Sequence, residues 1–211
     1  MNRVLIRVLP ILVFLLFHVS NSENEQVKQS LSVEKVVLDK LNLSRVVDFG
    51  SICKASSLSV LSLVKNDVVG LISEEIGNCK PLAHLYLNGN QLSGHLPYSL
   101  TQLSNLKKFD ISNSNFSGKV SYMPRILRLL TLLVHNNLHS GETPKLDFSN
   151  LILFNVSNNN FSGPLPDVKG RFSGNSWSGN PQLCRELISK AYPPSKASRR
   201  PRPTYMGKLG L

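Results

Sequence analysis

The feature that most constrains this chain is a sixteen-residue pattern, clearest in residues 82–97, which read LAHLYLNGNQLSGHLP. With Leu82 counted as position 0, apolar residues stand at positions 3, 5, 10 and 14, with Asn at 8, Gly at 12 and Pro at 15. This spacing is neither a helical period nor a strand alternation. The template fits six times along the chain, starting at Val33, Leu58, Leu82, Leu106, Leu129 and Leu151. A recurrence every 22 to 25 residues indicates a solenoid of stacked, similar coils.

Positions 3 and 5 are apolar in every repeat: Val36/Leu38, Leu61/Leu63, Leu85/Leu87, Phe109/Ile111, Leu132/Val134 and Phe154/Val156. Each pair predicts a short strand that points both residues inward and pairs in parallel with the next coil. The rest of each unit supplies the long return that parallel strands need. We therefore expect an α/β fold: a right-handed leucine-rich-repeat solenoid with a parallel sheet on its concave face and short 3-10 or helical turns and loops on its convex face.

Polar and glycine positions repeat as well. Position 8 is asparagine in four repeats, and we expect these side chains to form a ladder that satisfies backbone groups where strand turns into loop. The ladder residues are Asn66, Asn90, Asn137 and Asn159, whereas Leu41 and Ser114 depart from the pattern. Glycine at position 12 predicts a backbone conformation or close approach denied to other residues. Proline at position 15 predicts the end of strand pairing.

The first 22 residues have the layout of a secretory signal peptide. Arg3 and Arg7 precede an apolar run that is too short to cross a bilayer, and small and polar residues follow it. No other segment has the length of a membrane span. We expect a mature chain without a transmembrane segment, secreted or held at the extracellular face of the plasma membrane.

The remaining segments are assigned by composition. Residues 23–32 form a short polar remnant in place of an amino-terminal cap, and the six repeats occupy residues 33–166. Residues 167–184 are expected to cap the last coil with their large apolar side chains, which are Phe172, Trp177 and Leu183. Residues 185–211 are rich in Pro, Ser, Lys and Arg and are expected to be a disordered tail.

The basic character of the chain is a property of that tail. The formal net charge is +11, and the stretch from Gln182 onward carries seven Lys and Arg residues against one Glu. A nucleic-acid-binding protein would instead place basic residues and aromatics together on a folded face. Nucleic acid is therefore not an expected partner, while weak contact of the tail with anionic lipid headgroups stays open.

Three cysteines, Cys53, Cys79 and Cys184, leave at least one thiol free, intermolecular or without its partner. Cys79 stands where the next repeat has a leucine, so we interpret it as a small buried apolar residue rather than a reactive thiol. Cys53 could be partly exposed, and its partner is not identified. No CxxC or Cys/His cluster indicates a metal, and no cofactor is expected.

No catalytic site is predicted. The histidines beyond the signal segment are His84, His95, His135 and His139. They stand at different repeat positions, and no nucleophile and base accompany one another by pattern.

The consensus LxxLxLxxNxLSGx(L/I)P, complete in residues 82–97 and nearly complete in 151–166, resembles the plant-type leucine-rich repeat of receptor-like kinase ectodomains. The resemblance extends from Val33 to about Cys184. The run GNSWSGNPQLC resembles the terminal cap of those ectodomains, and PPSKASRRPRP resembles the basic segment that precedes their membrane helix. The number of repeats fits the branch with few repeats, which includes pollen receptor-like and catalytically inactive kinases.

Several family features are missing from this sequence. There is no amino-terminal cap with a helix, a Trp and a cysteine pair, and no second cysteine follows Cys184. The kinase signature motifs have no counterpart, so phosphoryl transfer is not expected. The resemblance thus implies an ectodomain truncated before the membrane and kinase regions.

Recognition is expected on the concave face, where positions 2, 4 and 6 of neighbouring strands form columns. The candidate ligand-binding residues are His84, Tyr86, Lys108, Asp110, Thr131, Leu133 and His135. The alternative is a solvated sheet face without a ligand. Four sequons predict N-glycosylation, at Asn42, Asn115, Asn155 and Asn160. Asn155 is at position 4, so its glycan would lie on the concave face.

We therefore expect an extracellular, non-catalytic module that binds a peptide or protein ligand, with a co-receptor as a further partner. One alternative is a secreted inhibitor of a cell-wall hydrolase. Another is a truncated product without independent function, because Val36 and Leu38 would present an open core face in the absence of a cap.

Overall fold

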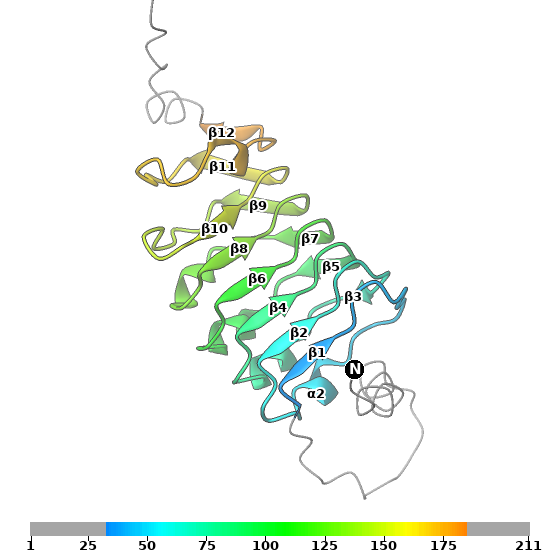
Figure 1. Cartoon of the computed structure of the whole chain (residues 1–211). Helices are drawn as coiled ribbons and strands as arrows, with labels where there is room; N and C mark the ends of the chain where they lie inside the picture. The colour runs from blue at the N-terminus through cyan, green and yellow to red at the C-terminus, as the bar shows by residue number, and fades with distance from the viewer. Residues whose placement is uncertain (1–32, 185–211) are drawn as a thin grey trace, which may run out of the picture.

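The computed structural model describes residues 33–184, which form a stack of similar coils (Figure 1). One side of the stack is a six-stranded parallel sheet in the order β1-β2-β4-β6-β8-β10. Its strands are β1 (Lys35–Val37), β2 (Val60–Ser62), β4 (His84–Tyr86), β6 (Lys108–Asp110), β8 (Thr131–Leu133) and β10 (Leu153–Asn155). Each strand begins two residues after the start of a repeat. The predicted leucine-rich-repeat solenoid is confirmed. Predictions about residues 1–32 and 185–211 lie outside the described residues.

A second six-stranded parallel sheet forms where only loops were expected. Its strands are β3 (Val69–Gly70), β5 (Gln91–His95), β7 (Asn115–Gly118), β9 (Leu138–Glu142), β11 (Asn160–Pro164) and β12 (Gln182–Cys184). The glycines at position 12 lie within these strands with positive φ. A Cβ on Gly94 would lie 2.3 Å from a methyl carbon of Leu71 in the preceding coil. Glycine therefore lets successive coils approach closely within the sheet, as the sequence predicts.

Short helical turns form the third side of the stack. They are α2 (Phe49–Ile52) and the 3-10 turns η1 (Glu74–Asn78), η2 (Tyr98–Gln102), η3 (Met123–Arg125) and η4 (Gly174–Ser176). The carboxylate of Glu74 accepts the backbone N–H groups of Tyr98 at 3.2 Å and Ser99 at 2.9 Å, across to the next coil. Hydrogen bonds from Ser99 lower the pKa of Glu74. An acidic side chain in one coil thus caps the turn of the next.

The apolar residues at positions 3 and 5 lie inside the coils, and all twelve are buried to 3% exposure or less. Val36 and Leu38 are among them, so the expectation of an open core face at the first coil is wrong. Both belong to one continuous core with Phe49 and Ile52 of α2. The first coil therefore supplies its own helical turn to the core, in the absence of a recognisable cap sequence.

A disulfide joins Cys53 to Cys79, with the two Cα atoms 4.6 Å apart. Cys79 is fully buried as expected, but its interpretation as a free apolar residue is wrong. The two cysteines are 26 residues apart, about one repeat, so stacking places them side by side. Equivalent positions in adjacent coils lie close to the strand spacing of about 4.8 Å, within reach of a disulfide. Cys184, the remaining cysteine, is free and exposed.

Buried asparagines tie the coils together. The side-chain amide of Asn90 donates to the carbonyl oxygens of Leu63 in the preceding coil and Leu87 in its own coil, both at 2.8 Å. Its Oδ1 accepts the N–H of Val68 at 3.1 Å. Asn66, Asn137 and Asn159 make the same pattern of bonds. Asn180 makes the same bonds within residues 167–184, the segment that was predicted to be a cap without a repeat.

Aromatic side chains close the carboxyl-terminal end. Phe154 of β10 lies 4.8 Å from Trp177 and 5.5 Å from Phe172 between ring centroids, and Phe148 packs against all three. Phe172, Trp177 and Leu183 are all buried. β12 continues the second sheet by pairing with β11. Residues 167–184 therefore cover the last coil with both a ring cluster and an extra strand.

Truncation of this ring cluster should strongly destabilise the stack. We expect Phe154→Ala to lower the free energy of unfolding by about 3–5 kcal/mol, because it leaves a large cavity among three aromatic neighbours. Urea unfolding followed by circular dichroism measures the loss, and the fluorescence of Trp177, the one tryptophan in the chain, reports on the cluster itself. Leu127→Ala, at a leucine that is 85% exposed, is the matched control and should change stability by less than about 0.5 kcal/mol.

Completing the asparagine ladder should stabilise the protein. Ser114 occupies the ladder position between the third and fourth coils, and its buried Oγ has no hydrogen-bond partner among the described residues. We expect Ser114→Asn to raise the free energy of unfolding by about 1 kcal/mol, because its amide could bond the carbonyl groups of Leu87 and Ile111. The reverse change, Asn90→Ser, should lower stability by about 1–3 kcal/mol in the same urea titration. An unchanged or lowered midpoint for Ser114→Asn would contradict this view of the ladder.

Candidate functional site

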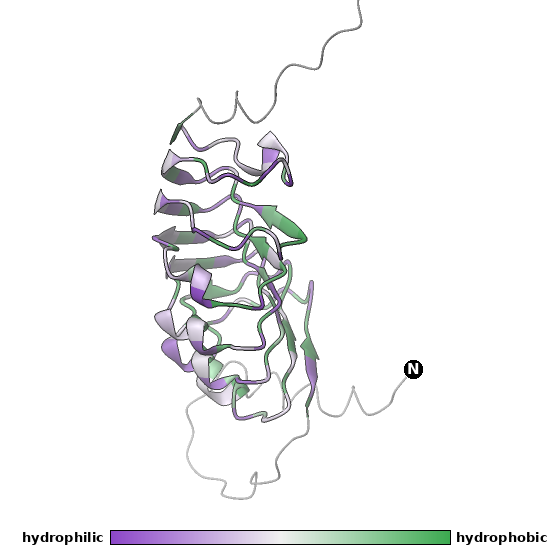
Figure 2. Cartoon of the chain, turned by 90° about the vertical axis from the view of Figure 1, so that its left-hand side faces the viewer, coloured by the Kyte–Doolittle hydropathy of each residue, from purple (hydrophilic) through white to green (hydrophobic). Residues whose placement is uncertain are grey.

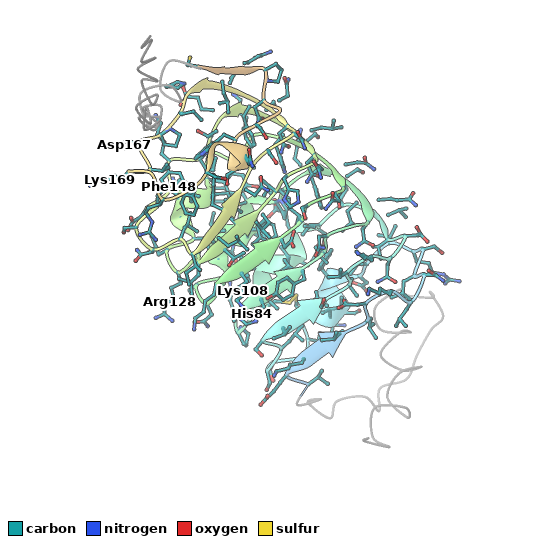
Figure 3. All side chains as sticks on the ribbon, turned by 45° about the horizontal axis from the view of Figure 1, so that its top comes forward. His84, Lys108, Arg128, Phe148, Asp167 and Lys169 are labelled. Carbon is teal, nitrogen blue, oxygen red and sulfur yellow. A yellow bond between two sulfur atoms is a disulfide. The ribbon has the colours of Figure 1, made fainter. Side chains whose placement is uncertain are left out.

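The outward face of the first sheet brings most of the predicted recognition residues together. The register pairs His84 with Lys108 and Lys108 with Thr131 along one row. A second row pairs Tyr86 with Asp110 and Asp110 with Leu133. These six residues come from β4, β6 and β8, whose neighbouring strands lie about 4.8 Å apart. Figure 3 shows His84 and Lys108 close together on this face. We call the six residues the concave platform.

Accessibility separates the members of the platform. His84, Tyr86, Lys108, Asp110 and Leu133 are half-buried, so each keeps surface that a ligand can contact. Thr131 is only 9% exposed and offers little contact area. His135 lies outside the platform, beyond the end of β8, and its Nδ1 is buried without a hydrogen-bond partner among the described residues. Five of the seven predicted residues therefore lie together on the first sheet with side chains that are partly accessible.

The charges of the platform are segregated along the strands. Burial lowers the pKa of His84, and the positive charges of Lys108, Lys107 and Lys35 lower it further. At the other end of β6, Asp110 Oδ1 accepts the N–H of Ser112 at 3.0 Å and its hydroxyl at 2.7 Å. The cations thus gather where the strands begin, and the carboxylate of Asp110 is held by its own turn where β6 ends.

Several outward-facing residues were missed in the sequence analysis. Lys35 and Leu153 occupy position 2 in the first and last repeats, in the same row as His84. Lys107 and Ile152 are at position 1 of their repeats. The rule that positions 2, 4 and 6 face outward was applied only to the middle repeats, and applying it to the end repeats would have found Lys35 and Leu153. Lys107 and Ile152 stand at position 1, before the strands, so the rule does not predict that they face outward.

A second, exposed row of asparagines runs along the edge beyond the strands. Asn113, Asn136 and Asn158 at position 7 all have φ near +54, a left-handed conformation that asparagine tolerates. The amide of Asn136 donates to Asn113 Oδ1 at 2.6 Å, and that of Asn158 donates to Asn136 Oδ1 at 2.7 Å. This row was also missed, although its asparagines recur at one repeat position.

The sequons differ in their surroundings. Asn42 is exposed, and Asn115 and Asn160 are exposed on β7 and β11 of the second sheet. Asn155 is half-buried on β10 of the first sheet, next to Leu133, and its Oδ1 accepts the N–H of Ser157 at 2.9 Å. Three of the four predicted glycans would therefore lie away from the concave platform.

His139 is a core residue. Its ring stacks between Phe116 and Phe161, at centroid distances of 6.5 and 6.1 Å. Its Nδ1 lies 3.4 Å from the carbonyl oxygen of Gly118, and its Nε2 is buried without a partner among the described residues. Burial lowers the pKa of His139 to about 4. It therefore acts as a neutral ring of the core.

Within residues 33–184, no group of three or more His, Cys, Asp or Glu side chains is arranged to hold a metal ion. In the same range no helix is long and apolar enough to span a bilayer.

The chain matches the Leucine Rich Repeat family over residues 81–103. It is 42% identical over 71 residues to the inactive leucine-rich repeat receptor-like serine/threonine-protein kinase At1g60630 of Arabidopsis thaliana, a stretch covering 34% of this chain and 11% of that protein. Four such curated relatives, from rice and Arabidopsis, are matched over only 5% to 11% of their lengths.

Solved receptor structures share the fold. The plant peptide hormone receptor RGFR1, in complex with RGF2, gives a TM-score of 0.63 at 26% identity over 70% of this chain and 24% of the receptor. The Arabidopsis receptor kinase HAESA, in complex with the peptide hormone IDA and the co-receptor SERK1, gives a TM-score of 0.57 at 28% identity. That match covers 70% of this chain and 30% of the receptor chain.

The buried histidine predicts a pH dependence of stability. Because the folded pKa of His139 is about 4 and an unfolded histidine titrates near 6.5, the unfolded state binds protons first as the pH falls. His139 should therefore cost about 2 kcal/mol of stability between pH 7 and pH 5. His139→Phe, which keeps an aromatic ring in the stack, should flatten the stability profile by that amount in urea titrations at the two pH values. Parallel profiles for the variant and the natural protein would contradict the burial of a neutral histidine.

Proposed function

The described part of the chain is a leucine-rich-repeat solenoid similar to the ectodomains of plant receptor kinases, and we propose that it is a non-catalytic extracellular recognition module. On this proposal, a peptide or protein partner binds across the concave platform of the first sheet. The proposal rests on the platform's register, which holds half-buried side chains of β4, β6 and β8 side by side.

The chemistry of the platform suits binding. Tyr86 is half-buried, and its ring lies 6.0 Å from that of His84, so an amphipathic side chain stands on a rigid strand next to a charged row. A side chain that is already ordered loses little conformational freedom when a partner binds, and tyrosine is enriched among the residues that dominate binding energy. Parallel pairing on both sides keeps β4 and β6 from moving relative to each other.

The similar receptors support a peptide or protein as the partner. RGFR1 and HAESA were both solved with peptide hormones, and HAESA also with a co-receptor. This chain corresponds to only 24% and 30% of the lengths of those receptor chains. We therefore propose the class of ligand, a peptide or protein, and not its identity. A co-receptor would be a second partner of the same module.

Capture of extracellular proteins and peptides provides a test. The full secreted chain is immobilised, incubated with extracellular wash fluid, and its bound partners are identified by mass spectrometry. We expect the double variant Tyr86→Ala/Lys108→Ala to unfold at the same temperature as the natural chain. The amount of partner that it captures should fall at least tenfold. Lys145→Ala, at an exposed lysine that within residues 33–184 pairs with the exposed Glu142, is the control and should bind as the natural chain does.

Two outcomes would overturn the proposal. Partners that are retained equally by the double variant would place the binding surface elsewhere. Partners that are cell-wall hydrolases, and whose activity the chain inhibits, would make it an enzyme inhibitor instead of a receptor-type module.

A further inference from the structure

The outward face of the first sheet is divided into a charged half and an apolar half. We propose that its partner is an extended peptide segment carrying an acidic residue and, three or four positions away, an apolar residue. This inference rests on the proposed function and specifies the ligand of that same surface. The acidic residue contacts a cationic cluster of Lys35, Lys107 and Lys108 around His84, and the apolar residue contacts an apolar shelf of Leu133, Ile152 and Leu153.

Within residues 33–184, no side chain forms an ion pair with the cationic cluster. Lys108 pairs with His84 in the sheet register, and Lys107 and Lys35 are close enough to His84 to act on it electrostatically. Among the side chains of residues 33–184, the ion pair that forms is Lys145 with Glu142, far along the chain from this cluster. A carboxylate from a partner would therefore meet several unpaired positive charges on a partly desolvated sheet, where such contacts are stronger than in open water.

Of the nearby carboxylates, Asp110 and Asp39 are engaged elsewhere, and Glu34, which precedes Lys35, forms no ion pair among the described residues. Asp110 bonds Ser112 within its own turn. Asp39 Oδ1 accepts the Ser62 hydroxyl at 2.6 Å and the Val64 N–H at 2.8 Å. Their negative charge at the ends of the strands also repels an acidic ligand from that side. An anion is thus directed to the beginning of the strands, next to Lys107 and Lys108.

The apolar shelf adjoins the cluster on the carboxyl-terminal side. Ile152, which precedes β10, is 74% exposed, and Leu153, the first residue of β10, is 50% exposed, while Leu133 on β8 is half-buried. Figure 2 shows hydrophobic colouring on the carboxyl-terminal strands of the first sheet. Large apolar side chains that share one face with unpaired charges are typical of a binding surface, because solvent alone gives no reason to keep them together.

The sheet spacing sets the separation between the two ligand residues. Lys108 on β6 and Leu153 on β10 belong to the same row, two strands apart. At about 4.8 Å per strand this is about 10 Å, and a carboxylate placed between His84 and Lys108 would lie about 12 Å from Leu153. An extended chain advances about 3.3 Å per residue, so three or four residues bridge the distance.

Selection from a peptide library tests this inference without a known ligand. A displayed library of random twelve-residue peptides is selected on the full chain. We expect enrichment of Asp or Glu three or four positions from Leu, Ile, Val or Phe. Selection on Lys107→Glu/Lys108→Glu should reverse the charge preference toward Lys and Arg. Lys119→Glu, at an exposed lysine beyond the second sheet, is the matched charge control and should leave the selected pattern unchanged.

A second pair of variants examines the shelf. Selection on Ile152→Ser/Leu153→Ser should keep the acidic preference and lose the apolar one. For one selected peptide made synthetically, the dissociation constant should rise at least fivefold between 50 and 500 mM NaCl, because added salt screens the exposed charges.

The outcomes separate this inference from the proposed function. Peptides that lose binding to Tyr86→Ala but carry no acidic preference would overturn the inference and leave the platform as the binding surface. Peptides that bind every first-sheet variant as tightly as the natural chain would contradict both this inference and the proposed function. A library that yields no binders would also overturn the inference.

Discussion

Each coil of this solenoid depends on hydrogen bonds that the neighbouring coil completes. The strands of the first sheet are three residues long, too short to be stable alone, and the amide of each ladder asparagine bonds carbonyl groups of two successive coils. Stability is therefore a sum over interfaces between neighbours. The same pairing sets the surface, because His84 and Lys108 lie side by side only while β4 and β6 stay in register.

The fold could be predicted where one physical demand recurs in every coil. A residue that points into the stack must be apolar in each copy, and Leu85 and Leu87 show the pattern that all coils follow. The second sheet was missed because turns and loops were expected on the return of each coil, while the positive φ of Gly94 is compatible with a strand beneath Leu71. The disulfide was missed because one-repeat spacing between Cys53 and Cys79 signals contact only after the stacking is known. The Asn180 rung was missed because the apolar positions after it shift by one.

The candidate site was partly predictable for a related reason. Counting positions assigns residues to a face, and the platform residues on β4, β6 and β8 followed directly from this rule. Counting does not reveal exposure, which depends on the size of neighbouring side chains. Thr131 is buried and Leu153 is open, although both occupy position 2. The lack of counter-charges around Lys108 depends on which carboxylates the turns retain, as Asp110 shows.

Ser114, which stands at a ladder position where other repeats have asparagine, divides the buried ladder into two parts. Asn66 and Asn90 bind the first three coils to one another, and Asn137, Asn159 and Asn180 bind the last three coils and the terminal cap. The joint between the third and fourth coils, where Ser114 stands, therefore lacks the amide bonds that its neighbours have. This joint runs directly beneath His84 and Lys108. The backbone pairing of β4 with β6 and of β5 with β7, together with the continuous core, therefore holds this joint without a side-chain amide.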